Sequence, residues 1–172
     1  MVRFLTIIFV ILCFSSCMRY NEYGYYRVGL SKFTIKPNTN NLAYTIIDTT
    51  VIYRFIKDER INISGSGIPR YYKFYSNGRI AEFYDRNVNL KTGNILDAKK
   101  GHMGYYNLDE KNFVIQFYNS NANASELTSE TILIKNDTLI SIKKYYNPDA
   151  EIKSFFIKED IPNYIRITKP DW

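Results

Sequence analysis

The fold class is decided by residues 71–83, which have the sequence YYKFYSNGRIAEF. Strand-forming residues flank the pair Asn77-Gly78, and this pair is the preferred centre of a two-residue type I′ hairpin because both positions need positive φ. Such a turn sets a register in which Lys73 lies opposite Glu82. The sequence therefore predicts an antiparallel hairpin here.

In the predicted register the hairpin has two chemically different faces. The apolar face, which we expect to point into the core, carries Tyr72, Phe74, Ala81 and Phe83. The other face carries Tyr71, Tyr75 and Tyr84, together with Ile80 and the ion pair of Lys73 with Glu82. Because phenol rings can grip a sugar, a peptide or a partner protein, Tyr71, Tyr75 and Tyr84 form a candidate binding face. Packing of these tyrosines beneath a loop is the alternative.

The same thirteen residues resemble one MORN-type repeat, the hairpin pattern YxNG+hxxE that also occurs in small lipoproteins of Bacteroidetes. A looser version, YYNPDAEI, occupies residues 145–152 and is one residue longer across its turn. The difference in length argues against a regular repeat array.

Outward from the hairpin, segments rich in Ile, Val, Thr, Tyr and Phe alternate with turn residues. The expected strands are 44–57, 70–75, 79–84, 104–108, 113–118, 131–135, 138–146 and 151–158. No stretch after Cys17 has a clear 3.6-residue apolar period, so at most one helical turn is expected, near residues 121–127. Residues 44–172 are therefore predicted to form an all-β domain, an antiparallel meander of about eight strands in an open sheet or a small barrel.

Residues 1–16 have the layout of a signal peptide, which we expect to be helical. A short positive start precedes the apolar run FLTIIFVILCF at residues 4–14, which is interrupted only by Thr6. As a helix this run would span about 16 Å, about half of a roughly 30 Å hydrocarbon core, so it is too short for a stable transmembrane anchor.

The run ends in Phe14-Ser15-Ser16-Cys17, which resembles the lipobox of bacterial lipoproteins. The resemblance implies that the leader is cut before Cys17 and that Cys17 carries two or three acyl chains, with residues 17–43 as a lipidated N-terminus and tether. Two or more chains, at about 0.8 kcal/mol per buried methylene, hold a protein stably on a membrane. Phe14 and Ser16 depart from the preferred Leu and Gly or Ala of the motif. The alternative is an ordinary secretory leader with no lipid on Cys17.

Cys17 is followed by Met-Arg-Tyr, with no aspartate and no acidic cluster. By resemblance to lipoprotein sorting signals, this implies an outer-membrane anchor facing the periplasm, with an envelope protein or polymer as the expected partner. A eukaryotic secreted protein is the other possibility, in which Asn62, Asn123 and Asn136 would be glycosylation acceptors.

Composition and motifs favour a binding protein over an enzyme. The chain has 172 residues and a net charge of +6, which becomes +5 when Arg3 leaves with the leader. Charges of both signs alternate, which is typical of a solvated surface and not of a nucleic-acid groove. The single histidine, His102, is expected in a solvent-exposed, glycine-bounded loop, and a metal or nucleophilic site would have to borrow its other members from elsewhere. The carboxylate pair Glu82 and Asp85 projects to opposite faces of a strand.

We therefore expect no catalytic residues, no metal and no cofactor, and a non-enzymatic, lipid-anchored binding or interaction protein of the cell envelope. Two alternatives have structural requirements. A lipocalin-like carrier of a small apolar ligand needs a closed barrel with an empty interior. A hydrolase needs a cleft that holds His102 or several carboxylates.

Overall fold

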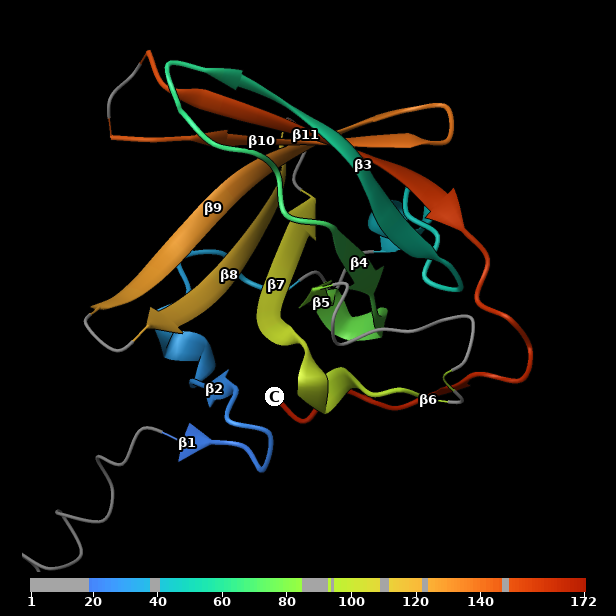
Figure 1. Cartoon of the computed structure of the whole chain (residues 1–172). Coiled ribbons are helices and arrows are strands. Elements are labelled where there is room, and N and C mark those ends of the chain that lie inside the picture. Colours follow the sequence, from blue (N-terminus) through green and yellow to red (C-terminus); the bar gives the residue numbers. More distant parts are fainter. Residues whose placement is uncertain are drawn as a thin grey trace, which may run out of the picture.

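The computed structural model in Figure 1 describes residues 19–37, 41–84, 93, 95–108, 112–121, 124–146 and 149–172. The predicted signal-peptide helix and Cys17 lie outside the described residues.

Eight antiparallel strands form a closed barrel (Figure 1), which confirms the predicted all-β meander in its barrel form. The strands are β3 (Ile52–Ile61), β4 (Arg70–Phe74), β5 (Arg79–Tyr84), β7 (His102–Leu108), β8 (Phe113–Asn121), β9 (Ala124–Lys135), β10 (Thr138–Lys144) and β11 (Glu151–Glu159). Each barrel strand pairs with the next one along the chain, and β11 returns to β3 to close the ring. The sequence allows at most one helical turn near residues 121–127, and the described part of that range contains none, because β8 continues to Asn121 and β9 begins at Ala124.

Short elements surround the barrel. The described elements that are not barrel strands are β1 (Arg19–Tyr20), β2 (Tyr26–Arg27), β6 (Ile95–Leu96), β12 (Arg166–Ile167) and the 3-10 turns η1 (Leu30–Lys32), η2 (Asn41–Thr45), η3 (Ser76–Gly78) and η5 (Ala98–Lys100). β1 pairs with β2, and β6 pairs in parallel with β12. Within the described residues, no helix combines the length and the apolar character needed to cross a membrane.

The β4–β5 hairpin forms where the sequence predicts it, but the predicted register is wrong by one residue. Tyr72 pairs with Glu82, and Phe74 pairs with Ile80. The reason lies in the turn, which has three residues, because the Tyr75 amide donates to the Arg79 carbonyl oxygen at 2.8 Å. Asn77 and Gly78 supply the positive φ values, 64° and 72°, as the second and third residues of this loop.

A one-residue slip turns every β5 side chain to the opposite face. Ile80 and Glu82 now point into the barrel beside Tyr72, whereas Ala81 and Phe83 point outward. The predicted pair of Lys73 with Glu82 is absent. The Lys73 ammonium lies on the outer side and donates to the carbonyl oxygens of Thr49 and Val51, and burial lowers the pKa of Lys73 to about 8.

Aromatic rings fill one end of the barrel interior. The rings are those of Tyr53, Tyr72, Phe74, Tyr106, Phe113, Phe117 and Phe156. Tyr72 stacks on Phe156 with ring centroids 4.4 Å apart. Gly104 gives the cluster room, because a Cβ there would lie 2.6 Å from the Gln116 carbonyl oxygen and 2.6 Å from the Phe117 ring. The barrel is therefore a packed core at this end.

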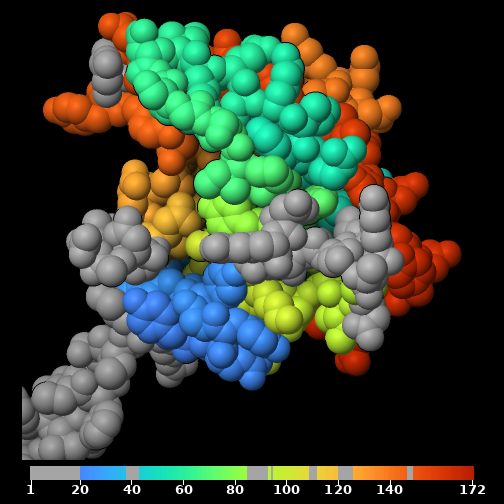
Figure 2. Space-filling model, in the orientation of Figure 1, coloured from blue at the N-terminus to red at the C-terminus, as the bar shows by residue number. Residues whose placement is uncertain are grey.

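Residues 19–37 of the predicted 17–43 tether lie against the outside of the barrel, where Figure 2 shows them in blue, whereas Ala43 is buried in the interior cluster. Phe33 is buried with Met103 and Tyr105. The Thr34 amide donates to Oε1 of Gln116 at 3.0 Å, and Phe33 packs edge-on against Tyr105 with ring centroids 4.7 Å apart. Residues 33–35 are thus part of the folded body.

Candidate functional site

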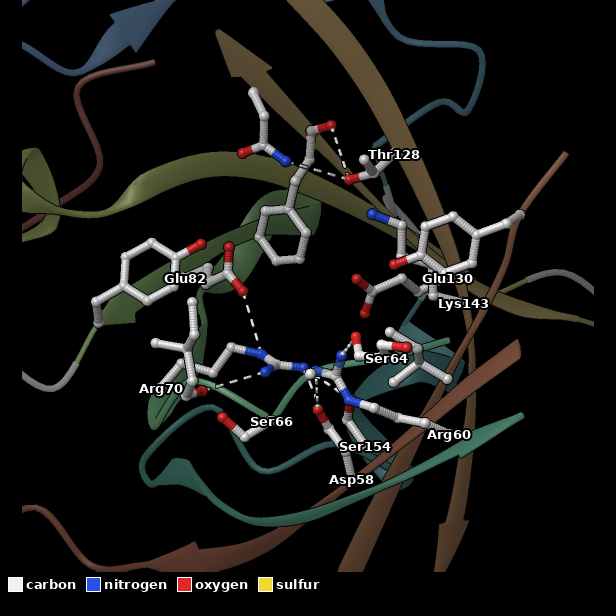
Figure 3. Close-up of a pocket in the computed structure, with 17 residues that line it drawn as sticks. Asp58, Arg60, Ser64, Ser66, Arg70, Glu82, Thr128, Glu130, Lys143 and Ser154 are labelled. Carbon is white, nitrogen blue, oxygen red and sulfur yellow. Dashed lines mark hydrogen bonds and ion pairs between the residues drawn. The ribbon is translucent and has the colours of Figure 1, made fainter. Parts of the chain in front are cut away.

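The other end of the barrel interior contains a pocket of about 460 Å³, within the range of small-ligand sites. We call it the charged pocket (Figure 3). It is lined by Asp58, Arg60, Ser64, Gly65, Ser66, Ile68, Arg70, Glu82, Tyr84, Phe117, Asn119, Thr128, Glu130, Lys143, Tyr145, Ile152 and Ser154. Strands β3, β4, β5, β8, β9, β10 and β11 all contribute, so the pocket exists only because the sheet closes.

Arg70 lies at the centre of the charged pocket. Alternation along β4 turns Arg70 inward on the same face as Tyr72. Its Nε lies 3.3 Å from Oε1 of Glu82, and its Nη2 donates to Oγ of Ser154 at 2.7 Å (Figure 3). Its Nη1 donates to the carbonyl oxygen of Ile68 at 3.2 Å.

The surroundings of Arg70 hold its guanidinium group in position and keep it protonated. Its guanidinium carbon lies 4.9 Å and 5.3 Å from the ring centres of Phe55 and Phe156. Burial acts to lower the pKa of Arg70, but Tyr72 and Glu82 raise it, and the net shift is upward. Arg70 is therefore a fixed cation on top of the aromatic cluster.

Glu82 enters the pocket from β5 and is buried. Burial raises the pKa of Glu82 to about 7, while Arg70 acts to lower it and Glu130 acts to raise it. Burial likewise raises the pKa of the neighbouring Tyr84 phenol to about 12. Near neutral pH, Glu82 is accordingly a mixture of the acid and the carboxylate, whereas Tyr84 keeps its proton.

Glu130 points from β9 into the barrel and accepts hydrogen bonds from two hydroxyl groups. The Tyr72 hydroxyl donates to its Oε2 at 2.9 Å, and the Ser141 hydroxyl donates to the same oxygen. These bonds fix the carboxylate at the boundary between the aromatic cluster and the charged pocket. Burial raises the pKa of Tyr72 well above its ordinary value, and the nearby Glu130 carboxylate raises it further. The Tyr72 phenol therefore keeps its proton and remains a hydrogen-bond donor.

Asp58 and Arg60 point inward from the end of β3. Nη2 of Arg60 lies 2.8 Å from Oδ2 of Asp58, whose side chain is only 3% exposed. Among the described residues, Asp58 Oδ1 and Arg60 Nε have no hydrogen-bond partner although both atoms are buried. Buried polar atoms without partners are rare, so these two indicate a place for water or a ligand.

The loop between β3 and β4 closes over Asp58. A Cβ at Gly67 would lie 2.6 Å from Oδ2 of Asp58 and 2.5 Å from the Phe55 ring. Gly65 has a φ of 108°, a backbone conformation that residues other than glycine rarely adopt. The two glycines therefore allow residues 64–68 to form one wall of the pocket.

Lys143 differs from the two arginines. It lies near the end of β10, and within the described part of the chain no carboxylate oxygen comes within 4.0 Å of its ammonium. The ammonium lies 5.1 Å from the ring centre of Tyr145 instead. The pocket thus has three cations and three carboxylates, and its charge becomes positive as Glu82 takes up a proton.

The three tyrosines of the predicted binding face do not share a face. Tyr71 and Tyr75 lie outside the barrel, packed with Phe83 and with Leu96. Tyr75 is only 9% exposed. Tyr84 faces inward and lines the charged pocket. The one-residue register slip separates them, and Tyr71 and Tyr75 have the packing role that we gave as the alternative.

His102 begins β7 and is not in a loop. Its ring lies edge-on against Tyr84 at 5.3 Å and against Tyr25 at 5.1 Å between centroids. In the described ranges, no group of three His, Cys, Asp or Glu side chains could hold a metal ion. Asp85, nominated with Glu82 as a carboxylate pair, lies outside the described residues.

Arg70, Glu130 and Lys143 line the pocket but were not predicted as site residues from the sequence. The signal that could have found them is a charged residue at an inward position of a strand, as with Arg70 two positions before Tyr72. That signal can be used only when the inward positions of each strand are known, and for β5 the predicted register exchanged the inward and outward positions.

Searches of protein-family models, curated proteins and solved structures found no match to this chain.

Proposed function

We propose that this protein is a lipid-anchored, non-enzymatic binding protein of the bacterial cell envelope that binds a small polar ligand, or the end of an envelope polymer, in the charged pocket. One observation carries the proposal. One end of the barrel interior is filled by aromatic rings, and the other end is a pocket whose buried polar atoms include two that have no hydrogen-bond partner among the described residues. A barrel needs no such charges for its stability, because buried ion pairs add little over well-packed apolar residues.

The binding proposal is tested by blocking the pocket. Ser66 is exposed at the edge of the pocket, so Ser66→Trp fills the entrance with a bulky ring. Thr131→Trp is the matched control, because Thr131 is exposed on β9 and is not a lining residue. We expect a panel of polar metabolites, screened by native mass spectrometry, to contain a ligand that Ser66→Trp loses and Thr131→Trp keeps. A panel with no such ligand overturns the proposed pocket function.

The anchor is supported by the apolar run at residues 4–14 and by Cys17 at the end of the lipobox-like motif. Mass spectrometry of protein purified from its native cell tests it. We expect the N-terminal peptide to begin at Cys17 and to carry the mass of diacylglycerol, with or without a further acyl chain. A full-length, unacylated protein in the cytosol contradicts the proposal.

A lipocalin-like carrier of an apolar molecule has one feature in its favour, the closed barrel. The interior argues against it, since aromatic rings fill one end of the barrel and charged side chains line the pocket at the other end. We expect no saturable fluorescence change with the apolar probe N-phenyl-1-naphthylamine. Saturable binding that a fatty acid displaces would favour the carrier.

A hydrolase is a second candidate because the pocket holds the carboxylates of Asp58, Glu82 and Glu130. Each is already engaged, Asp58 with Arg60, Glu82 with Arg70, and Glu130 with two hydroxyls. We therefore expect no turnover of nitrophenyl glycosides or esters. Turnover that is lost in both Glu82→Gln and Glu130→Gln would replace the binding proposal.

A further inference from the structure

The arrangement of charges in the pocket identifies a class of ligand, an inference that rests on the proposed binding function. We propose that the charged pocket binds a small hydroxylated acid, such as a sugar acid or a sugar phosphate, with its acidic group held by Lys143 and Arg70 and its hydroxyls by Glu130 and Asp58.

Lys143 provides the first contact for the acidic group. Arg60 is paired with Asp58 at 2.8 Å and Arg70 with Glu82 at 3.3 Å, whereas within the described residues Lys143 has no carboxylate within 4.0 Å. Lys143 is half-buried at the pocket, where charges are screened less than on an open surface. An anionic group placed there gains a partner without breaking an existing ion pair.

Arg70 provides the second contact. A guanidinium has five N–H donors, and within the described residues those of Arg70 bond to Glu82, Ser154 and the Ile68 carbonyl. Its Nη2 also lies 3.9 Å from Oδ1 of Asp58, which is an ion pair but too long for a hydrogen bond. The 3.3 Å contact with Glu82 is longer than the 2.7–2.9 Å typical of a charge-assisted hydrogen bond. Arg70 therefore has donors left for an acidic group that competes with Glu82.

The competition makes ligand binding depend on pH. The groups that face or neighbour Glu82 are Arg70 on β4, Tyr72 on β4, Tyr84 on β5, His102 on β7, Glu130 on β9 and Lys143 on β10. Because the pKa of Glu82 is about 7, a second negative charge beside it favours its protonated form. Binding of an acid then takes up as much as one proton, and the affinity rises as the pH falls from 8 to 6.

The rest of the lining requires hydroxyls or other donors on the ligand. Both hydroxyls that bind Glu130 use Oε2, which leaves Oε1 as an acceptor, and Oδ1 of Asp58 accepts no hydrogen bond from a described residue. Tyr84 and Tyr145 also line the pocket, and phenol rings commonly pack against sugars. A simple anion would leave these acceptors unused, whereas a hydroxylated acid pairs with them.

The test is isothermal titration of the detergent-solubilised mature protein with a series of hexoses that differ in charge. The probes are D-glucuronate and glucose 6-phosphate as acids, D-glucose as the neutral sugar, glucosamine as the cation and inorganic phosphate as the anion without hydroxyls. We expect at least one acidic sugar to bind at least tenfold more tightly than glucose, glucosamine and phosphate. Its affinity should rise between pH 8 and pH 6 by at most tenfold per pH unit, the limit for one proton.

Three variants locate the contacts. Lys143→Met should lower the affinity for the acidic sugar tenfold or more. Lys144→Met, on the exposed outer face of the same strand, should leave that affinity unchanged. Glu82→Gln should bind the acid with an affinity that no longer changes with pH. Equal binding in Lys143→Met and Lys144→Met overturns the assignment of the acidic group, and an unchanged pH dependence in Glu82→Gln overturns the proton coupling.

The outcome separates this inference from the proposed function. A neutral or cationic ligand that Ser66→Trp abolishes overturns the ligand class and leaves the binding function standing. If inorganic phosphate binds as tightly as the acidic sugars, the proposed hydrogen bonds between ligand hydroxyls and the pocket carboxylates are overturned. Competition of the acidic monosaccharide by an oligosaccharide that ends in the same acid assigns a polymer terminus as the source, and its absence assigns the free sugar.

Discussion

Replacing Glu82 by glutamine should change how the stability of the protein depends on pH. Glu82 is buried, and burial raises its pKa from an ordinary 4.5 to about 7 in the folded protein. The folded state therefore holds the proton more tightly than the unfolded state. The stability that Glu82 contributes is fully present below about pH 4.5 and is lost as the pH rises through 7.

The size of the effect follows from the difference between the two pKa values. One pKa unit corresponds to about 1.4 kcal/mol, so the shift of Glu82 is worth about 3 kcal/mol. Glutamine keeps the shape of the side chain and an oxygen that can accept a hydrogen bond from Arg70, but it does not titrate. Relative to the wild type, Glu82→Gln should gain about 3 kcal/mol in free energy of unfolding between pH 4.5 and pH 8.5.

Urea unfolding at a series of pH values measures this difference. Trp172, the only tryptophan, reports on the barrel because its Nε1 donates to the Gly104 carbonyl oxygen at 3.3 Å. Glu59→Gln is the control, since the Glu59 side chain is 52% exposed. A difference between Glu82→Gln and the wild type that stays constant from pH 4.5 to 8.5 would refute the assigned burial of Glu82.

Three further predictions concern the barrel and its pocket. Gly104→Ala should lower the free energy of unfolding by about 1–3 kcal/mol through overpacking, and an unchanged melting temperature would contradict the close approach of β8. Tyr72→Phe should cost about 1–3 kcal/mol at neutral pH because Glu130 loses a buried donor, measured by urea unfolding; a cost below 0.5 kcal/mol (about half of one ordinary hydrogen bond) would count against that bond. Gly67→Ala should push the 64–68 loop away from Asp58 and weaken the pocket ligand, and a calorimetric affinity equal to that of the wild type would disprove this role of the loop.

Part of the candidate site could be predicted from the sequence and part could not. The sequence nominated Glu82 and Tyr84, and both line the pocket, although for reasons other than the predicted ones. Tyr71 and Tyr75 were expected beside Tyr84, but they lie outside the barrel. The error comes from a single loop residue. A two-residue and a three-residue turn can both use Asn77-Gly78 for positive φ, but they turn the side chains of β5 to opposite faces of the sheet.

What the sequence determines by itself is local. The alternation of side chains along each strand, the positive φ of Asn77-Gly78 and the apolar run before Cys17 depend on near neighbours in the chain, so single segments reveal them. The return of β11 to β3 and the register of β5 are decided only in the folded protein, because they depend on which side chains can be buried together. Closure then brings Arg70, Glu130 and Lys143 around one pocket from strands far apart in sequence, where their charges interact at low dielectric.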